Sequence, residues 1–96
     1  MAKFTLSNKA EEDLLSIGRY TQGKWGITQR NRYLRELDKT FPLLSEHPTK
    51  GRKCDNIRQG YLKYRVGRHL IYFCKMPTEI EIVRILHHRM DADRHL

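Results

Sequence analysis

The spacing of the apolar residues changes near residue 61, and this change limits the folds that the chain can adopt. Before it, apolar side chains recur every three or four residues in two runs, which predicts two amphipathic helices. Asn8 is the expected N-cap of the first helix, which extends to Gly23, and Thr28 is the expected cap of the second, which extends to Leu44. The two runs are separated by about five residues, and so short a connection favours an antiparallel helical hairpin.

Pro42 lies inside the second helical run. Proline has no N–H to donate to the carbonyl group of Asp38, four residues before it. We therefore expect the helix to bend or open here, with residues 43–45 forming a separate turn.

After residue 61 polar and apolar residues alternate, which predicts strands with one face in the core. Turns at Gly67-Arg68 and around Pro77 divide this part into an antiparallel series, and a short strand is expected at residues 3–6. The three later strands span residues 61–66, 69–75 and 80–86. The sequence thus predicts an α+β fold in one domain, residues 1–96, with an N-terminal strand, an antiparallel helical hairpin and a three-stranded antiparallel sheet.

The formal net charge of +8 is concentrated in one part of the chain. Residues 50–75 contain eight Lys and Arg against one Asp, whereas residues 1–49 contain eight against six acids and residues 76–96 three against four. A localised positive field attracts polyanions, which here are nucleic acid, an anionic surface or an acidic protein segment. Charge by itself fits all three partners.

Cys54 and Cys74 are widely spaced. This spacing is typical neither of a disulfide-rich secreted protein nor of a zinc site, so we expect two reduced thiols, with Cys74 in the core. We expect no metal and no cofactor. The sequence shows no secretory signal and no apolar stretch of membrane-spanning length, which favours a cytoplasmic protein without membrane contact.

His87 and His88 follow the last predicted strand. A neutral imidazole can act as an acid or a base at cellular pH. As neighbours on an extended segment the two rings are expected to point to opposite sides, which makes them a poor metal chelate. Surface histidines without a chemical role are the alternative interpretation.

Arg84 is the cation in the last predicted strand. Strict alternation places it on the same face as Ile80, Ile82 and Leu86. An arginine on such a partly apolar face either pairs with an acid or binds an anion. The cations expected beside it in the second case, on neighbouring strands, are Arg58 and Arg65.

Cations alternate with tyrosines in the most basic part of the chain. On nucleic acid, the cations would contact phosphates while the tyrosines stack on unpaired bases. The same pattern fits a groove for an acidic partner segment, or a solvated strand face whose tyrosines pack. The residues concerned are Lys50, Arg52, Lys53, Arg58, Tyr61, Lys63, Tyr64, Arg65 and Arg68.

A series of short motifs extends over nearly all 96 residues. The motifs are Leu14-Leu15-Ser16-Ile17 with Tyr20, Trp25-Gly26, Tyr33 with Leu37 and Phe41, Pro48 with Gly51-Arg52, Asp55 to Tyr61, Val66 to His69, and Ile85 to Asp91. In this order and spacing the chain resembles ParE-type toxins of the RelE/ParE superfamily, the toxin half of bacterial type II toxin-antitoxin modules. The resemblance implies an N-terminal strand, a helical hairpin and a C-terminal antiparallel sheet.

The resemblance also implies a function, which is inhibition of DNA gyrase by binding, so that replication is blocked. It implies a ParD-type antitoxin with a flexible segment that folds along the toxin, and nucleic acid reached indirectly through gyrase. The residues expected to contact gyrase are Arg84, His87, His88, Arg89, Met90, Asp91 and Arg94. Those expected to contact the antitoxin are Arg58, Tyr61, Lys63, Tyr64 and Arg65.

The ribonuclease branch of the same superfamily is the alternative. RelE-like toxins cut mRNA on the ribosome, which needs a base for the 2′-hydroxyl, cations for the phosphate and an acid for the leaving oxygen. The residues that would serve are Arg65, Arg84, His87 and His88. Because no tyrosine follows Tyr72 and the ending of the chain resembles ParE, gyrase inhibition is preferred. An inactive toxin-like binding module is a third interpretation.

Overall fold

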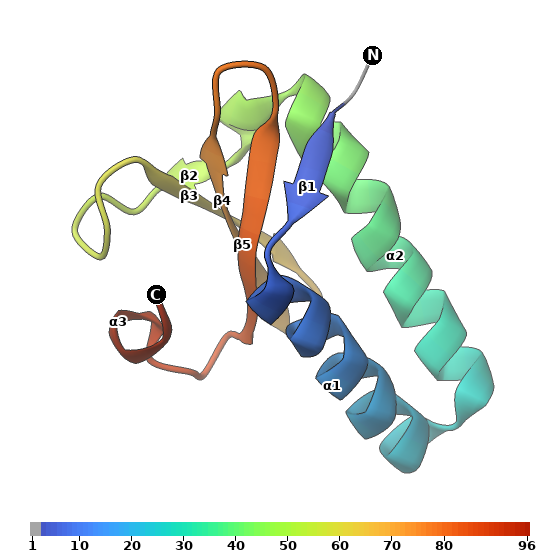
Figure 1. The fold of residues 1–96 in the computed structure, drawn as a ribbon. Helices are drawn as coiled ribbons and strands as arrows, with labels where there is room; N and C mark the ends of the chain where they lie inside the picture. Colours follow the sequence, from blue (N-terminus) through green and yellow to red (C-terminus); the bar gives the residue numbers. More distant parts are fainter. Residues whose placement is uncertain (1–2) are drawn as a thin grey trace.

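The computed structural model describes residues 3–96, in which two helices pack as a hairpin beside a sheet (Figure 1). The helices are α1, Asn8–Trp25, and α2, Ile27–Glu46. Strand β1, Phe4–Leu6, precedes the hairpin, and a short 3-10 helix, Pro48–Lys50, follows it. The later elements are β2, Arg52–Lys53, β3, Tyr61–Val66, β4, His69–Lys75, β5, Ile80–His87, and α3, Ala92–His95.

Within the described residues the strands form one five-stranded mixed sheet in the order β1-β5-β4-β3-β2. β1 runs parallel to β5, with Phe4 opposite Ile80, and the other neighbours are antiparallel. The α+β architecture is thereby confirmed, but the prediction of a three-stranded antiparallel sheet was wrong. β2 has two residues, too few for alternation to be visible, and β1 pairs with a strand from the far end of the chain, which local spacing does not reveal.

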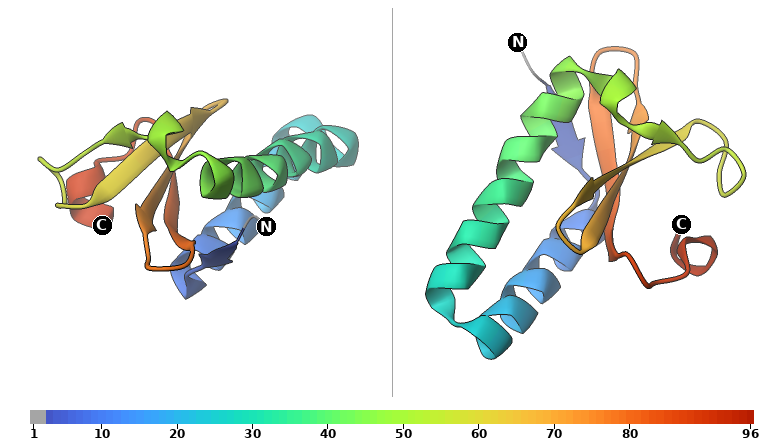
Figure 2. Two further views of the ribbon diagram at one scale, coloured as in Figure 1. Left: turned by 90° about the horizontal axis from the view of Figure 1, so that it is seen from above. Right: turned by 180° about the vertical axis from the view of Figure 1, so that it is seen from behind.

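The two faces of the sheet carry two separate apolar clusters. The hairpin and α3 cover opposite faces (Figure 2). The larger cluster, under the hairpin, includes Leu37, Phe41, Leu44, Ile71, Phe73 and Ile82. The smaller cluster, under α3, consists of Cys54, Tyr72, Leu86 and Ala92, with Ile57, Tyr61, Leu70 and Leu96 packed against it.

The start of α1 differs from the prediction by one residue. Ser7, rather than Asn8, is the N-cap, because its Oγ accepts a hydrogen bond from the Ala10 backbone N–H at 3.0 Å. The same hydroxyl donates to the Val83 carbonyl of β5 at 2.7 Å. The cap therefore also ties the first turn of α1 to the sheet, a contact that a sequence motif cannot reveal.

The connection between the helices is much shorter than predicted. α1 continues past Gly23 to Trp25, and α2 begins at Ile27, so Gly26 alone replaces the expected loop of about five residues. Gly26 has φ 91°, in the left-handed region that glycine adopts without strain. It also occupies the N-cap position of α2, so the prediction that Thr28 caps this helix was wrong.

Pro42 does not end α2, which continues to Glu46. Residues 43–45 therefore belong to the helix and are not a separate turn. Phe41 and Leu44, on either side of the proline, are 2% and 0% exposed. Because both side chains are buried in the larger cluster, their packing stabilises the helix around Pro42, where one backbone hydrogen bond is missing.

A β-bulge at Val83 changes the faces of β5. Tyr72 of β4 lies opposite Arg84, whereas the next residue, Phe73, lies opposite Ile82. Val83 is thus an extra residue, and the alternation of side chains shifts after it. Arg84 consequently shares no face with the two isoleucines before it, and the prediction from strict alternation was wrong on this point.

Cys54, rather than Cys74, is the fully buried cysteine. Cys54 is 1% exposed in the smaller cluster, while Cys74 is only half-buried. The prediction that Cys74 is the core cysteine was therefore wrong. Both thiols are free, as predicted.

Candidate functional site

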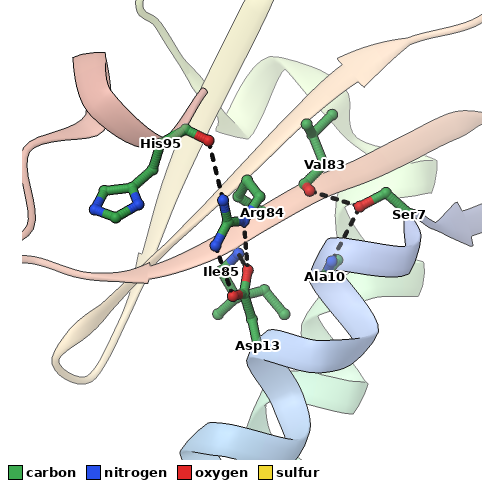
Figure 3. Close-up of polar contacts among 7 residues, drawn as sticks. All are labelled: Ser7, Ala10, Asp13, Val83, Arg84, Ile85 and His95. Atoms are coloured by element: carbon green, nitrogen blue, oxygen red, sulfur yellow. Dashed lines mark hydrogen bonds and ion pairs between the residues drawn. The ribbon is translucent and has the colours of Figure 1, made fainter.

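Arg84 is held by the carboxylate of Asp13 on α1. Its Nε and Nη2 donate to Asp13 Oδ2 and Oδ1, both at 2.9 Å, in a bidentate pair (Figure 3). The side chains of Arg84 and Asp13 are 15% and 14% exposed. The hydrogen bond that Arg84 donates to Asp13 raises the pKa of Arg84 above its ordinary value, although burial opposes this effect. The interpretation that Arg84 pairs with an acid is confirmed.

Asp13 has a second role at the edge of β5. Its Oδ2 accepts a hydrogen bond from the backbone N–H of Ile85 at 2.9 Å, beyond the end of β1. An exposed N–H at a sheet edge is thereby satisfied by a side chain. Sequence analysis missed this residue, although Asp13 stands four positions before the buried Ile17 and hence on the same face of α1.

The third guanidinium nitrogen of Arg84 holds the C-terminal segment. Nη1 donates to the backbone oxygen of His95 at 3.0 Å (Figure 3), and Arg58 Nη2 donates to the backbone oxygen of Leu96 at the same distance. Leu96 packs against the smaller cluster. Residues 87–96 thus include a docked helix, α3.

Docking of α3 turns several expected gyrase contacts outward. Arg89 and Met90 are exposed, and the Arg94 side chain is 84% exposed. Asp91 caps α3 by accepting a hydrogen bond from the Asp93 N–H at 3.1 Å. The expected set therefore divides into three parts: Arg84, which has a structural role, the half-buried His87 and His88, and an exposed group in the segment that Arg84 positions.

His87 and His88 contact each other, so the prediction that they point to opposite sides was wrong. Their rings stack with centroids 4.6 Å apart, because β5 ends at His87 and the extended backbone does not continue. His87 also meets His69 of β4 edge-on, at 5.5 Å between centroids. His69 Nδ1 lies 2.6 Å from the hydroxyl of Tyr33 on α2, so this histidine group lies on the hairpin side of the sheet.

Burial sets the protonation state of His69. Burial, and then the nearby imidazoles of His87 and His88, lower the pKa of His69 from 6.5 to about 4. His69 is therefore neutral at cellular pH.

Of the four candidate ribonuclease groups, Arg84 stands apart from the other three. Arg84 is engaged by Asp13 at the edge of β5, whereas His87 and His88 lie beside His69 near the hairpin. Arg65 is exposed and donates to the Gly67 carbonyl at 2.8 Å. Desolvation, and then the charge of nearby Arg65, lower the pKa of His88. Among residues 3–96, no three His, Cys, Asp or Glu side chains are arranged to hold a metal ion, and no described helix is long and apolar enough to cross a membrane.

The expected antitoxin contacts lie on two different faces. Those that face away from the hairpin are Tyr61, Lys63 and Arg65. Tyr64 packs against the larger cluster on the hairpin side and is separated from them by the sheet. Arg58 lies in the loop before β3, not on a strand, with its guanidinium carbon 5.7 Å from the centroid of the Tyr61 ring.

Comparisons with known proteins agree with this architecture over the whole chain. The sequence pattern described as "ParE toxin of type II toxin-antitoxin system, parDE" matches residues 4–92. The chain is 36% identical to Toxin ParE1 of Caulobacter vibrioides, over 100% of this chain and 99% of that protein. It is 39% identical to Toxin ParE1 of Mycobacterium tuberculosis, over 99% and 98% of the two chains.

A solved structure described as "Chromosomal ParDE TA system from P. aeruginosa" has the same fold. It superposes with a TM-score of 0.78 over 91% of this chain and 96% of that chain, at 18% sequence identity. From the sequence pattern and the full-length relatives it follows that the chain belongs to the ParE toxin family of type II toxin-antitoxin systems.

Proposed function

We propose that this toxin inhibits DNA gyrase by binding to it and that a ParD-type antitoxin neutralises it. The observation that carries the proposal is the docked segment of residues 87–96. Arg84 and Arg58 hold its backbone, and α3 packs on the sheet. Arg89, Met90 and Arg94 are thereby presented to solvent on a fixed support.

A fixed segment suits a toxin that acts by binding. Ordering a surface before association lowers the entropy lost in the complex. Arginine and methionine are also enriched in protein interfaces. Exposed Arg89, Met90 and Arg94 therefore form a suitable contact surface for a large protein target. In this mechanism gyrase cuts the DNA, and the toxin contributes no catalytic residue.

The placement of the candidate nuclease groups supports binding over RNA cleavage. A nuclease needs its acid, base and cations around one phosphate. Here the guanidinium of Arg84 is bonded to Asp13, and the imidazole of His87 packs on His69 near the hairpin. Arg84 and His87 thus make separate contacts on different parts of the sheet.

The proposed antitoxin surface is the cationic side of β3 that faces away from the hairpin. Lys63 and Arg65 project from this side, and Arg58 and Tyr61 lie at its end. An acidic antitoxin segment that folds on this surface would gain both charge pairing and contact with the tyrosine ring. Tyr64 is not part of this surface because it packs under the hairpin.

Two parallel assays test the proposal: supercoiling with formation of cleaved DNA-gyrase complexes, and mRNA cleavage on translating ribosomes. We expect activity in the first assay, and we expect Arg89→Ala combined with Arg94→Ala to reduce it about tenfold or more. The matched control combines Arg19→Ala with Arg35→Ala, which removes the same charge from exposed positions of the hairpin. Cleavage of mRNA with unchanged supercoiling would reverse the assignment, and activity in neither assay would favour the inactive module.

A further inference from the structure

The hairpin and the β3–β4 turn border an open cavity of about 330 Å³ that the proposed function does not use. Small-molecule sites commonly have volumes of about 300 to 1,000 Å³. None of its nine described lining residues is aliphatic or acidic. Five of them carry aromatic rings, namely Tyr20, Trp25, Tyr33, His69 and His87.

The inner wall of the cavity is fixed by the hydroxyl of Tyr33. This oxygen accepts a hydrogen bond from the Arg68 backbone N–H at 3.3 Å and donates its proton to the Val66 carbonyl at 3.0 Å. The same oxygen lies 2.6 Å from His69 Nδ1, a hydrogen bond whose direction depends on the imidazole tautomer. The wall therefore joins Tyr33, the β3–β4 turn and His69 through one hydroxyl group.

Gly67 brings the β3–β4 turn close to the same wall. A Cβ atom at Gly67 would lie 2.7 Å from Cε1 of the Tyr33 ring, and the residue has φ 56°. The turn and the aromatic wall are thus in direct contact. The cavity is therefore present before any ligand arrives.

Cations surround the aromatic wall. The guanidinium carbon of Arg68 lies 5.8 Å from the centroid of the Trp25 ring, and Lys24 Nζ lies 5.1 Å from a Trp25 ring centroid. The rim thus combines flat π surfaces with positive charge and contributes no carboxylate of its own.

We propose that this cavity binds a nucleotide, with the base against the rings of Tyr20 and Trp25 and the phosphate at Arg68. Bases stack on tyrosine, tryptophan, histidine and guanidinium planes, and guanidinium groups pair well with phosphate. Tyr20 and Trp25 are 61% and 48% exposed, so their rings are accessible. A free nucleotide and an unpaired nucleotide of a single strand present the same chemistry to this site.

An amphipathic helix fits the cavity less well. Aliphatic surroundings for the apolar face of such a helix lie elsewhere on the hairpin, in a hollow lined by Leu14, Leu15 and Leu34 together with Glu11 and Asp38. The lining of the cavity is instead aromatic, cationic and hydrogen-bonding. The proposal does not depend on gyrase inhibition, because its test changes Tyr20 and Arg68, whereas the test of gyrase binding changes Arg89 and Arg94. His87 is the one lining residue that also belongs to the C-terminal segment.

Trp25 is the only tryptophan of the chain, so its fluorescence reports directly on the cavity. The probes are AMP, a short single-stranded oligodeoxyadenylate and the same sequence as a duplex, with free N-acetyltryptophanamide as the optical control. We expect saturable quenching by AMP or by the single strand, and little by the duplex, whose bases are not free to stack. Saturation by AMP identifies a free nucleotide as a sufficient ligand, and saturation by the strand alone identifies a single-stranded nucleic acid.

Variants show whether the quenching arises in the cavity. Arg68→Ala and Tyr20→Ala are each expected to weaken binding about tenfold, whereas Tyr20→Phe, which keeps the ring, retains it. Arg52→Ala removes an exposed cation from β2 and serves as the charge control. The proposal is overturned if neither nucleotide probe gives saturable quenching, or if Arg68→Ala and Tyr20→Ala both bind like the parent. Saturable quenching by an acidic tyrosine-containing peptide alone would also overturn it and assign the cavity to a protein partner.

Discussion

Asp13 and Arg84 join the first helix to the last strand through two parallel N–H···O contacts of 2.9 Å. Asp13 also accepts the N–H of Ile85, and Arg84 also holds the backbone oxygen of His95. One ion pair therefore connects the hairpin, the sheet and the C-terminal helix. The position of the proposed gyrase-binding segment depends on an acid 71 positions before Arg84 in the chain.

Replacing this acid should loosen the C-terminal segment. Asp13→Asn leaves the partly buried Arg84 without a counter-charge, so we expect the free energy of unfolding to fall by about 2 to 4 kcal/mol. Amide exchange of residues 89–96 should become faster, because Arg84 then holds His95 less firmly. Urea unfolding and hydrogen exchange measure the two effects.

The control for this experiment is Glu11→Gln, an acid-to-amide change at an exposed position of the same helix. It should alter the free energy of unfolding by no more than about 0.5 kcal/mol. Equal losses in the two variants, or unchanged exchange of residues 89–96 in Asp13→Asn, would show that the pair does not position the segment.

The proposed antitoxin surface predicts a salt-dependent loss of affinity. We expect the combination Arg58→Ala, Lys63→Ala and Arg65→Ala to raise the Kd for the antitoxin about tenfold or more at low salt. The difference from the parent should shrink as salt screens the charges. Titration calorimetry at several salt concentrations measures it, while circular dichroism checks that α3, which Arg58 holds, is retained.

A second triple variant shows whether the position of the removed cations or only the net charge of the toxin determines the antitoxin affinity. Arg19→Ala, Arg32→Ala and Arg35→Ala remove the same charge from exposed sites on the hairpin. This control should change the antitoxin Kd much less than the first triple variant. If both variants lose affinity equally, only the overall charge matters and the proposed surface is wrong.

The neutral state of His69 predicts a pH dependence of stability. Its pKa is lowered from 6.5 to about 4 in the folded protein. Between these values the unfolded state binds more protons, so the contribution to stability is present above pH 6.5 and is lost as pH falls to about 4. With a discount for solvent screening of this partly exposed ring, the loss is on the order of 2 kcal/mol.

Denaturant unfolding between pH 4 and 7.5 measures this loss. In His69→Gln the slope of the unfolding free energy against pH should decrease in this window. His47→Gln, at an exposed residue after α2, should keep the parent slope. An unchanged slope in His69→Gln would assign the pH dependence to other groups.

Gly67 and Gly60 allow a test of the close approach between the turn and Tyr33. Both have positive φ, 56° and 85°, but only at Gly67 does an added Cβ meet another atom, the Tyr33 ring. Gly60→Ala should therefore cost about 1 to 2 kcal/mol of stability from backbone strain. Gly67→Ala should cost more, because it also displaces the ring, and it should weaken nucleotide binding. Similar losses in thermal unfolding of the two variants would contradict the contact.

The apolar spacing was sufficient to predict both helices and the three longer strands. Apolar residues such as Leu37, Phe41 and Ile71 recur at the period of their helix or strand, because one face of each of these elements is buried in the core. The sequence also indicated that Arg84 could pair with an acid, but it did not indicate that this acid is Asp13. What the spacing could not predict was β2, because two residues show no period, or the parallel pairing of β1.

The sequence-based predictions that were wrong concern features that depend on contacts between distant segments. Pro42 removes a backbone hydrogen bond from α2, but the burial of Phe41 and Leu44 stabilises the helix around it. The bulge at Val83 moves Arg84 to the other face and allows it to reach both Asp13 and His95. The end of β5 at His87 lets the two adjacent histidines stack.

The sequence by itself determined the elements, the family resemblance and the concentration of positive charge, because each is a property of residues close together in the chain. The tertiary structure decided which groups act together. It anchored residues 87–96 through Arg84, placed Tyr64 and Tyr61 on opposite faces, and gathered Trp25, Tyr33 and His69 around one cavity. These groupings depend on the register and packing of segments far apart in the chain, and local spacing carries no information about either.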